Sequence, residues 1–267
     1  MAFTSIAAGA EFALDGNRVW YEASGSGEPA IVMVHGWSCD SSFWRLQRPA
    51  LEKRYRVLAL DLPGHGKSDK PEMEYSVERF SRAVQRLLDA EKVSRAVLVG
   101  HSMGAMVIRQ TLADDPKRVI ALISIDGTVF SGVSAGLQKW AVQFASALRG
   151  SEHDAAATKF IEAIFRPSTP PALRQEIRTK MLSTPAHVAA SAMEKTLASE
   201  MWAVLPPATV PALAINARSD RGDRQADHAK LLPNLEYHEL DGVSHFLMLE
   251  KPDEVNRLIM DFVRRLQ

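Results

Sequence analysis

A serine, a histidine and an aspartate that lie far apart in this chain have the types and the surroundings needed for acyl transfer. Ser102 stands between two glycines in the stretch Gly100-His101-Ser102-Met103-Gly104, with the apolar run AVLV before it and AMVIRQTLADDP after it. A serine in a tight Gly-x-Ser-x-Gly turn between a strand and a helix can project as an exposed nucleophile, because glycines let the neighbouring chains come close. The pattern predicts a nucleophilic serine rather than a plain turn residue.

A serine hydroxyl is a weak nucleophile at neutral pH, so it needs a histidine base within hydrogen-bond reach and an acid that orients the base. Of the eight histidines, His245 follows the last expected strand and precedes the last expected helix. This position predicts a loop at the same edge of the sheet as Ser102. His65 is interpreted as a turn residue, and His35 and His101 as packing beside motif glycines. The other histidines lie in helical or solvent-facing patterns, where structural roles are expected: His153, His187, His228 and His238.

Two strand ends offer the acid. Asp220 follows the strand expected at 211–217, and the chain order serine, aspartate, histidine favours it as the acid. Asp126 ends the strand expected at 119–127 and remains the rival position. Asp223, in the same loop as Asp220, is a minor competitor.

Backbone N–H groups near the serine could stabilise the oxyanion of the transition state, because fixed donors do so better than mobile water. The N–H of Met103 comes directly after the nucleophile. The N–H of Trp37 follows His35-Gly36, where an earlier expected strand ends and the chain turns. We therefore predict an oxyanion hole formed by Trp37 and Met103.

The elements that must position these groups alternate along the chain. Continuous apolar runs are typical of strands buried on both faces of a parallel sheet. Helical patterns with one apolar face occur at 76–93, where Ser76 is the expected N-cap, and at 252–267. This alternation predicts an α/β protein with a doubly wound sheet. The expected strands lie at 30–36, 55–64, 95–101, 119–127, 211–217 and 235–240.

The alternation stops between 128 and 208, where the sequence has no convincing strand and consists of Ala-rich helical patterns divided by prolines. We predict a core formed by residues 1–127 and 209–267 and a helical cap at 128–208, laid over the carboxyl edge where such sheets bind ligands. Four aromatic residues are expected to reach the substrate pocket below the cap: Phe130, Trp140, Phe144 and Phe246. The helical spacing of Trp140 and Phe144 fits packing of the cap on the core as well.

Composition restricts the partners. Lys plus Arg and Asp plus Glu both number 32, so the net charge is zero and neither nucleic acid nor an anionic membrane is an expected partner. The single Cys39 excludes an internal disulfide and a cysteine-cluster metal site. No run of 18 apolar residues occurs, and the first residues lack a basic segment before their Ala-rich part. We expect a cytoplasmic protein with a small-molecule substrate, either monomeric or homodimeric.

On the basis of these residues and motifs, the chain resembles the α/β-hydrolase superfamily over essentially its whole length. The matching segments are 33–71, 97–105, 211–220 and 242–263, in the order and spacing of the family. The resemblance implies an eight-stranded, mostly parallel sheet flanked by helices, a triad of Ser102, Asp220 and His245, an inserted helical cap, and neither cofactor nor metal. Two departures touch no reacting group: Ala105 stands where many relatives have glycine, and Asn216-Ala217 precedes the acid.

The resemblance also implies a function. A serine nucleophile is typical of the esterases and lactonases of this superfamily, so we expect cleavage of carboxylic esters or lactones of small to medium apolar substrates through an acyl-enzyme. The same residues serve carbon-carbon bond hydrolases, thioesterases, perhydrolases and haloperoxidase-like members. A lyase activity or a non-catalytic ligand-binding homologue are further alternatives, because fold alone does not fix chemistry.

Overall fold

The computed structural model describes residues 8–127, 135–197, 208–218, 224–229 and 232–266. Within these ranges eight strands form one sheet in the order β1-β2-β4-β3-β5-β6-β7-β8. Pairing is antiparallel between β1, β2 and β4 and parallel from β4 to β8, which confirms the predicted eight-stranded, mostly parallel sheet. The strands are β1 (Ala8–Leu14), β2 (Asn17–Ser24), β3 (Ala30–Val34), β4 (Val57–Leu60), β5 (Ala96–His101), β6 (Val119–Ile125), β7 (Ala212–Ala217) and β8 (Leu235–Leu240).

The first two strands, which the apolar runs of the sequence did not predict, form a hairpin. Asp15 and Gly16 connect them with φ values of 51° and 78°. Two consecutive positive φ angles are typical of the Asp-Gly turn that joins tightly paired strands. β2 alternates between buried and more exposed residues, so it lacks the continuous apolar run of the central strands.

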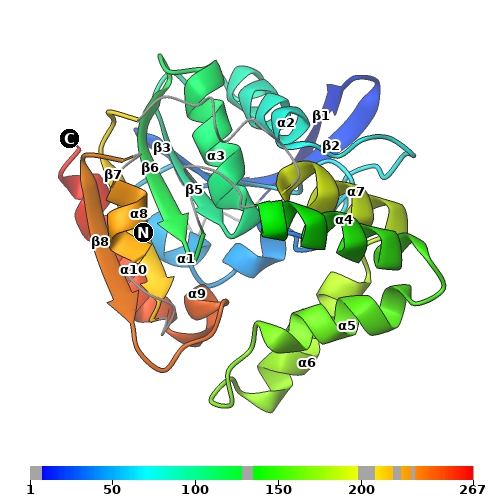
Figure 1. Cartoon of the computed structure of the whole chain (residues 1–267). Coiled ribbons are helices and arrows are strands. Elements are labelled where there is room, and N and C mark those ends of the chain that lie inside the picture. The colour runs from blue at the N-terminus through cyan, green and yellow to red at the C-terminus, as the bar shows by residue number, and fades with distance from the viewer. Residues whose placement is uncertain (1–7, 128–134, 198–207, 219–223, 230–231, 267) are drawn as a thin grey trace.

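Helices cover both faces of the sheet (Figure 1). α2 (Val77–Ala90) packs on α3 (Met103–Asp114) on one face, whereas α1 (Arg48–Leu51) lies beside α10 (Pro252–Arg264) on the other. Ser76 Oγ accepts a hydrogen bond from the Arg79 N–H (3.3 Å), which confirms the predicted N-cap of α2. The remaining short helices outside the interval 128–208 are η1 (Ser41–Trp44), α8 (Arg224–Ala229) and α9 (Leu247–Glu250).

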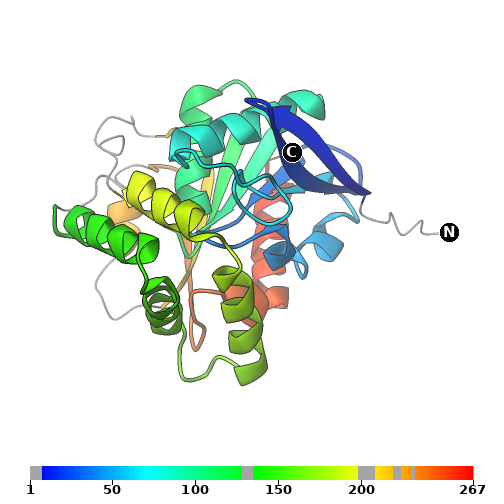
Figure 2. The ribbon, with the colours of Figure 1, turned by 90° about the vertical axis from the view of Figure 1, so that its right-hand side faces the viewer.

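Between β6 and β7 the described residues form four helices and no strand. They are α4 (Ala135–Arg149), α5 (His153–Ala163), α6 (Pro171–Leu182) and α7 (Ala186–Leu197), here called the helical insertion. Figure 2 shows the insertion, in green to yellow, gathered on one side of the sheet. α4 packs on α7, and α5 packs on both α4 and α6. The expected first residue of the cap, 128, lies outside the described residues, and so does the segment 198–207 before its expected last residue, 208. The division into core and cap therefore stays a prediction.

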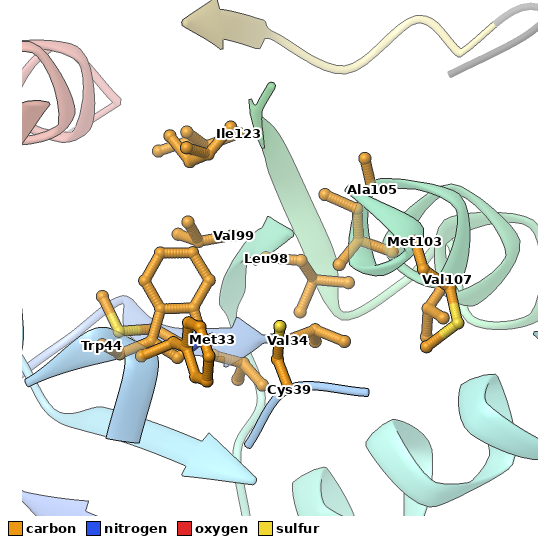
Figure 3. Packing of buried hydrophobic residues seen from close by; sticks show 14 of the residues in the cluster. Met33, Val34, Cys39, Trp44, Leu98, Val99, Met103, Ala105, Val107 and Ile123 are labelled. Atoms are coloured by element: carbon orange, nitrogen blue, oxygen red, sulfur yellow. The ribbon is translucent and has the colours of Figure 1, made fainter. Parts of the chain in front are cut away.

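The core lies on both faces of the central strands. Every residue of β3, β4 and β5 is buried, as the continuous apolar runs predicted. Figure 3 shows Met33, Val34, Leu98 and Val99 of the sheet together with Ala105 and Val107 of α3. None of the described helices is long and apolar enough to cross a membrane.

Candidate active site

Ser102 occupies a strained turn between β5 and α3. Its φ and ψ are 52° and −117°, a conformation that costs a non-glycine residue free energy and occurs mostly where function requires it. A Cβ atom on Gly100 would lie 2.3 Å from the Gly104 carbonyl oxygen, and a Cβ on Gly104 would lie 2.3 Å from the Val34 carbonyl oxygen. Only glycine fits at these two positions, so the motif glycines allow the elbow, as we call residues 100–104, to lie against β3.

His245 lies in the loop between β8 and α9 and is hydrogen-bonded to Asp126. The distance from His245 Nδ1 to Asp126 Oδ2 is 2.6 Å. Asp126 directly follows β6, and its Oδ1 accepts a hydrogen bond from the Ala217 N–H at the end of β7 (3.0 Å). The carboxylate is therefore held between two neighbouring strands with one oxygen directed at the imidazole.

The structure thus brings the rival acid position, Asp126, to the predicted base. Asp220, which the sequence favoured, lies outside the described residues, and so does Asp223. The Asp126 side chain is 10% exposed, so most of its interactions are with protein groups rather than bulk water.

Ser102, Asp126 and His245 all line one cavity. Within the described part of the chain, the Ser102 hydroxyl makes no direct hydrogen bond to the His245 ring. The two residues are neighbours through His101, whose ring centroid lies 4.7 Å from that of His245. Catalytic hydrogen bonds are often long before substrate binds, so this geometry is compatible with a nucleophile and its base.

The turn after β3 crosses close to Ser102. A Cβ on Gly36 would lie 3.1 Å from Ser102 Cβ, and the next residue, Trp37, lines the cavity together with Met103. Met103 is the first residue of α3, where backbone N–H groups have no partner within the helix. The two predicted oxyanion donors therefore belong to segments that meet at the serine.

The cavity measures about 450 Å³ and has a mainly apolar lining. Trp140 and Phe246, both predicted to reach the pocket, line it. Phe144 lies in a second layer, where its ring stacks on Trp140 with centroids 5.1 Å apart. Phe130 lies outside the described residues. No lysine or arginine occurs among the described residues that line the cavity.

Much of the lining was not predicted from the sequence. The unpredicted residues are apolar side chains from α3 and from the insertion, among them Met106, Phe160, Ile164, Met181, Met193 and Leu197. Their helical spacing equally fits ordinary packing, so the sequence offers no signal that separates a lining residue from a core residue. Cys39 also lines the cavity, and burial raises the pKa of its thiol well above the usual range.

His65 and His35 have structural positions, as predicted. His65 Nδ1 donates to the Pro63 carbonyl (3.0 Å), and burial lowers the pKa of His65 to about 3. His35 Nε2 accepts from the Leu62 N–H (2.9 Å), and burial lowers the pKa of His35 as well. Both rings are neutral and hold the turn between β4 and α2.

In the described ranges, no group of three or more His, Cys, Asp or Glu side chains is arranged to hold a metal ion. Of the ionisable side chains that line the cavity beside Ser102, the His245 imidazole and the Asp126 carboxylate are already bound to each other. The arrangement is suited to proton transfer to and from a hydroxyl.

Known proteins share this fold. An enol-lactonase from Burkholderia xenovorans LB400 superposes with a TM-score of 0.85 at 26% identity, over 96% of this chain and 100% of that one. A 2-hydroxy-6-oxononadienedioate/2-hydroxy-6-oxononatrienedioate hydrolase from Dechloromonas aromatica is 28% identical over 92% of this chain and 90% of its own length.

A dihydrolipoyllysine-residue acetyltransferase component of an acetoin cleaving system, from Pseudomonas putida, is 30% identical over 92% of this chain and 66% of its own length. The chain covers 66% of the length of this protein, and between 32% and 36% of the lengths of the next curated relatives. A sequence model of the alpha/beta hydrolase family matches residues 31–258. Together with the strand order and the elbow, this match shows that the chain belongs to the alpha/beta hydrolase family.

Proposed function

We propose that this protein is a serine hydrolase that cleaves carboxylic esters or lactones of small to medium apolar substrates through an acyl-enzyme on Ser102. The observation that carries the proposal is the hydrogen bond from His245 Nδ1 to Asp126 at the wall of an apolar cavity that Ser102 also lines. A neutral imidazole with its Nδ1 proton fixed by a carboxylate presents an unprotonated Nε2, which is the form a general base requires.

In this mechanism His245 removes the hydroxyl proton of Ser102 as the serine oxygen attacks the carbonyl carbon. The Asp126 carboxylate stabilises the imidazolium that forms, and the N–H groups of Trp37 and Met103 stabilise the oxyanion. When the tetrahedral intermediate collapses, the imidazolium gives its proton to the leaving alcohol. Water, deprotonated by the same imidazole, then hydrolyses the acyl-enzyme and restores the serine.

The acid in this proposal is Asp126. Replacing it by asparagine should lower kcat by roughly 10³ to 10⁴-fold, because the amide no longer fixes the imidazole tautomer or offsets its charge. Asp220→Asn is the matched variant and should keep kcat within about threefold. If Asp220→Asn carries the large loss and Asp126→Asn does not, the acid is Asp220.

The lining supports a neutral substrate. A substrate carboxylate held in an apolar cavity needs a cationic partner, because an unpaired buried charge is costly. The described lining residues include none. This argues for neutral esters and lactones and against a dianion such as the dioate in the name of the Dechloromonas relative. The enol-lactonase neighbour supports lactones among the candidate substrates.

A panel of p-nitrophenyl esters of graded acyl length, with lactones and a dioate carbon-carbon substrate beside them, tests the proposal. The wild-type protein should hydrolyse short and medium neutral esters or lactones, and Ser102→Ala should lose at least about 10⁴-fold in kcat/KM while its circular dichroism spectrum is unchanged. Retained turnover in Ser102→Ala would refute the serine mechanism. Cleavage of the dioate substrate alone would refute the substrate class.

A further inference from the structure

His101, the residue before Ser102, contacts the base as well as the elbow. Its Nε2 lies 2.9 Å from the His245 carbonyl oxygen, and its ring centroid lies 4.7 Å from that of His245. The ring is also 5.3 Å from Phe246, the next residue of the same loop. One side chain of β5 therefore touches two consecutive residues of the loop that holds the proposed base.

The protonation of His101 follows from these contacts. A carbonyl oxygen only accepts hydrogen bonds, so Nε2 carries the proton and donates it. Burial, and next the charge that His245 can carry, lower the pKa of His101 to about 3. His101 is thus neutral near pH 7, with a bare Nδ1 that has no hydrogen-bond partner in the described part of the structure. A Cβ on Gly36 would lie 2.9 Å from this nitrogen, so the other side of the ring lies against the turn before Trp37.

His245 is held at three points, and they differ in origin. Its backbone N–H donates to the Ile164 carbonyl (3.3 Å), which follows α5 in the helical insertion. Its Nδ1 donates to Asp126, and its carbonyl accepts from His101. The His101 contact fixes the backbone of the base to β5, a fully buried central strand, independently of the insertion.

We propose that His101 is a positioning residue for His245: its Nε2–H anchors the His245 carbonyl, so that the imidazole faces Ser102 in one orientation. This inference rests on the proposed function, because it concerns how the proposed base is held. An ordinary packing role predicts that any side chain of similar volume will serve. A positioning role requires a hydrogen-bond donor where Nε2 lies.

A matched pair of variants separates these roles. His101→Gln keeps an N–H donor at a similar reach, and His101→Met has a similar length and volume but no donor. In His101→Met we expect kcat for a hydrolysed ester to fall roughly 10 to 100-fold with KM within about twofold, because a small displacement of a catalytic group costs rate rather than binding. His101→Gln should recover kcat to within about threefold of the wild type. His238→Gln, on β8 outside the cavity, serves as the surface control.

A proton NMR measurement gives a second result that does not depend on turnover. The Nδ1 proton shared by His245 and Asp126 should give a low-field resonance in the wild type and in His101→Gln, and the resonance should broaden or disappear in His101→Met. Wild-type kcat in His101→Met, or equal losses in both variants, overturns the proposal. So does a tenfold loss in His101→Gln alone, which keeps the donor. If the wild type hydrolyses no ester, the proposed function fails, and the resonance still decides whether His101 orders the base.

Discussion

The elbow and the helical insertion line the same cavity, but backbone contacts determine the shape of the elbow and side-chain packing determines that of the insertion. At the elbow, backbone atoms meet so closely that Gly100 and Gly104 leave no room for a Cβ atom. In the insertion, a Cβ on Gly150 would meet the Ala147 carbonyl oxygen at 3.6 Å, an ordinary contact. The first region depends on backbone geometry, and the second on apolar side chains that others of similar size could replace.

The two regions also supply different chemistry. The sheet edge contributes Ser102, Asp126 and His245, whereas the insertion contributes apolar groups such as Phe160 and Met193. They meet at Trp37, whose Nε1 donates to the Ala189 carbonyl of α7 (2.8 Å) and whose ring packs edge-on against Phe160. We infer from this difference that the sheet edge performs the proposed reaction and that the insertion selects the substrate.

The strongest test of this contrast exchanges one glycine in each region for alanine. Gly104→Ala places a methyl group 2.3 Å from a backbone oxygen of β3, so it should destabilise the protein by at least about 3 kcal/mol and abolish turnover. Gly150→Ala should change stability by no more than about 0.5 kcal/mol. Urea unfolding and ester hydrolysis of both variants measure this, and equal effects would contradict the contrast.

Acid should weaken the sheet region through its buried histidines. The pKa of His65 and that of His101 fall from an ordinary value of 6.5 to about 3 on folding. Between these values the unfolded chain binds more protons than the folded one. The contribution of the two histidines to the free energy of unfolding is therefore fully present above about pH 6.5 and is lost as the pH falls toward 3. At pH 5 each histidine should lower the free energy of unfolding by about 2 kcal/mol relative to pH 8.

Urea unfolding at pH 8 and pH 5 checks this expectation in the wild type and in His65→Gln. The variant removes one titrating group, so its stability should depend less steeply on pH, whatever its absolute stability. If the free energy of unfolding changes between pH 8 and pH 5 by the same amount in His65→Gln as in the wild type, His65 does not titrate as described.

A change in the insertion should alter substrate preference more than chemistry. Met193 lines the cavity from α7, so Met193→Ala should enlarge it. The ratio of kcat/KM for the octanoate ester to that for the butyrate ester should rise roughly tenfold, because burying about two more CH₂ groups contributes about 0.8 kcal/mol each. Activity on the acetate ester should change less than about threefold. Stability should fall by about 1 to 2 kcal/mol, since the side chain already borders a cavity.

Met260→Ala, on α10 and outside the cavity lining, is the control for this specificity change. It should leave the chain-length ratio unchanged. A shift of similar size in Met260→Ala would mean that preference follows general loosening rather than the lining.

Much of the sheet could be predicted from sequence because its signals are local. The elbow around Ser102 follows from a short motif that requires a particular backbone geometry. The buried strands β3, β4 and β5 follow from short continuous apolar runs. The β1–β2 hairpin was missed because its alternating strands carry a weaker apolar signal, although Asp15-Gly16 marks the turn.

The acid could not be chosen from sequence. Asp126 and Asp220 both follow parallel strands that end at the same edge, and β6 and β7 are neighbours in the sheet. Which carboxylate meets His245 depends on how far each loop reaches, a non-local property that motifs do not encode. The structure pairs His245 with Asp126, and Asp220 lies outside the described residues.

The cavity lining was predicted in part for a related reason. Helical spacing placed Trp140 and Phe144 on one face of α4, but the rotation of α4 against α5 decides which of them reaches the cavity. Trp140 lines it, whereas Phe144 packs behind, with its ring centroid 5.1 Å from that of Phe160. Single-residue patterns cannot specify that rotation.

Mass spectrometry of the protein quenched during turnover of a slow ester tests the central claim most directly. The account predicts a covalent adduct with the mass of the acyl group on the peptide that contains Ser102, absent from Ser102→Ala. Rapid ester hydrolysis without an adduct on Ser102, or an adduct on another residue such as Cys39, would contradict it.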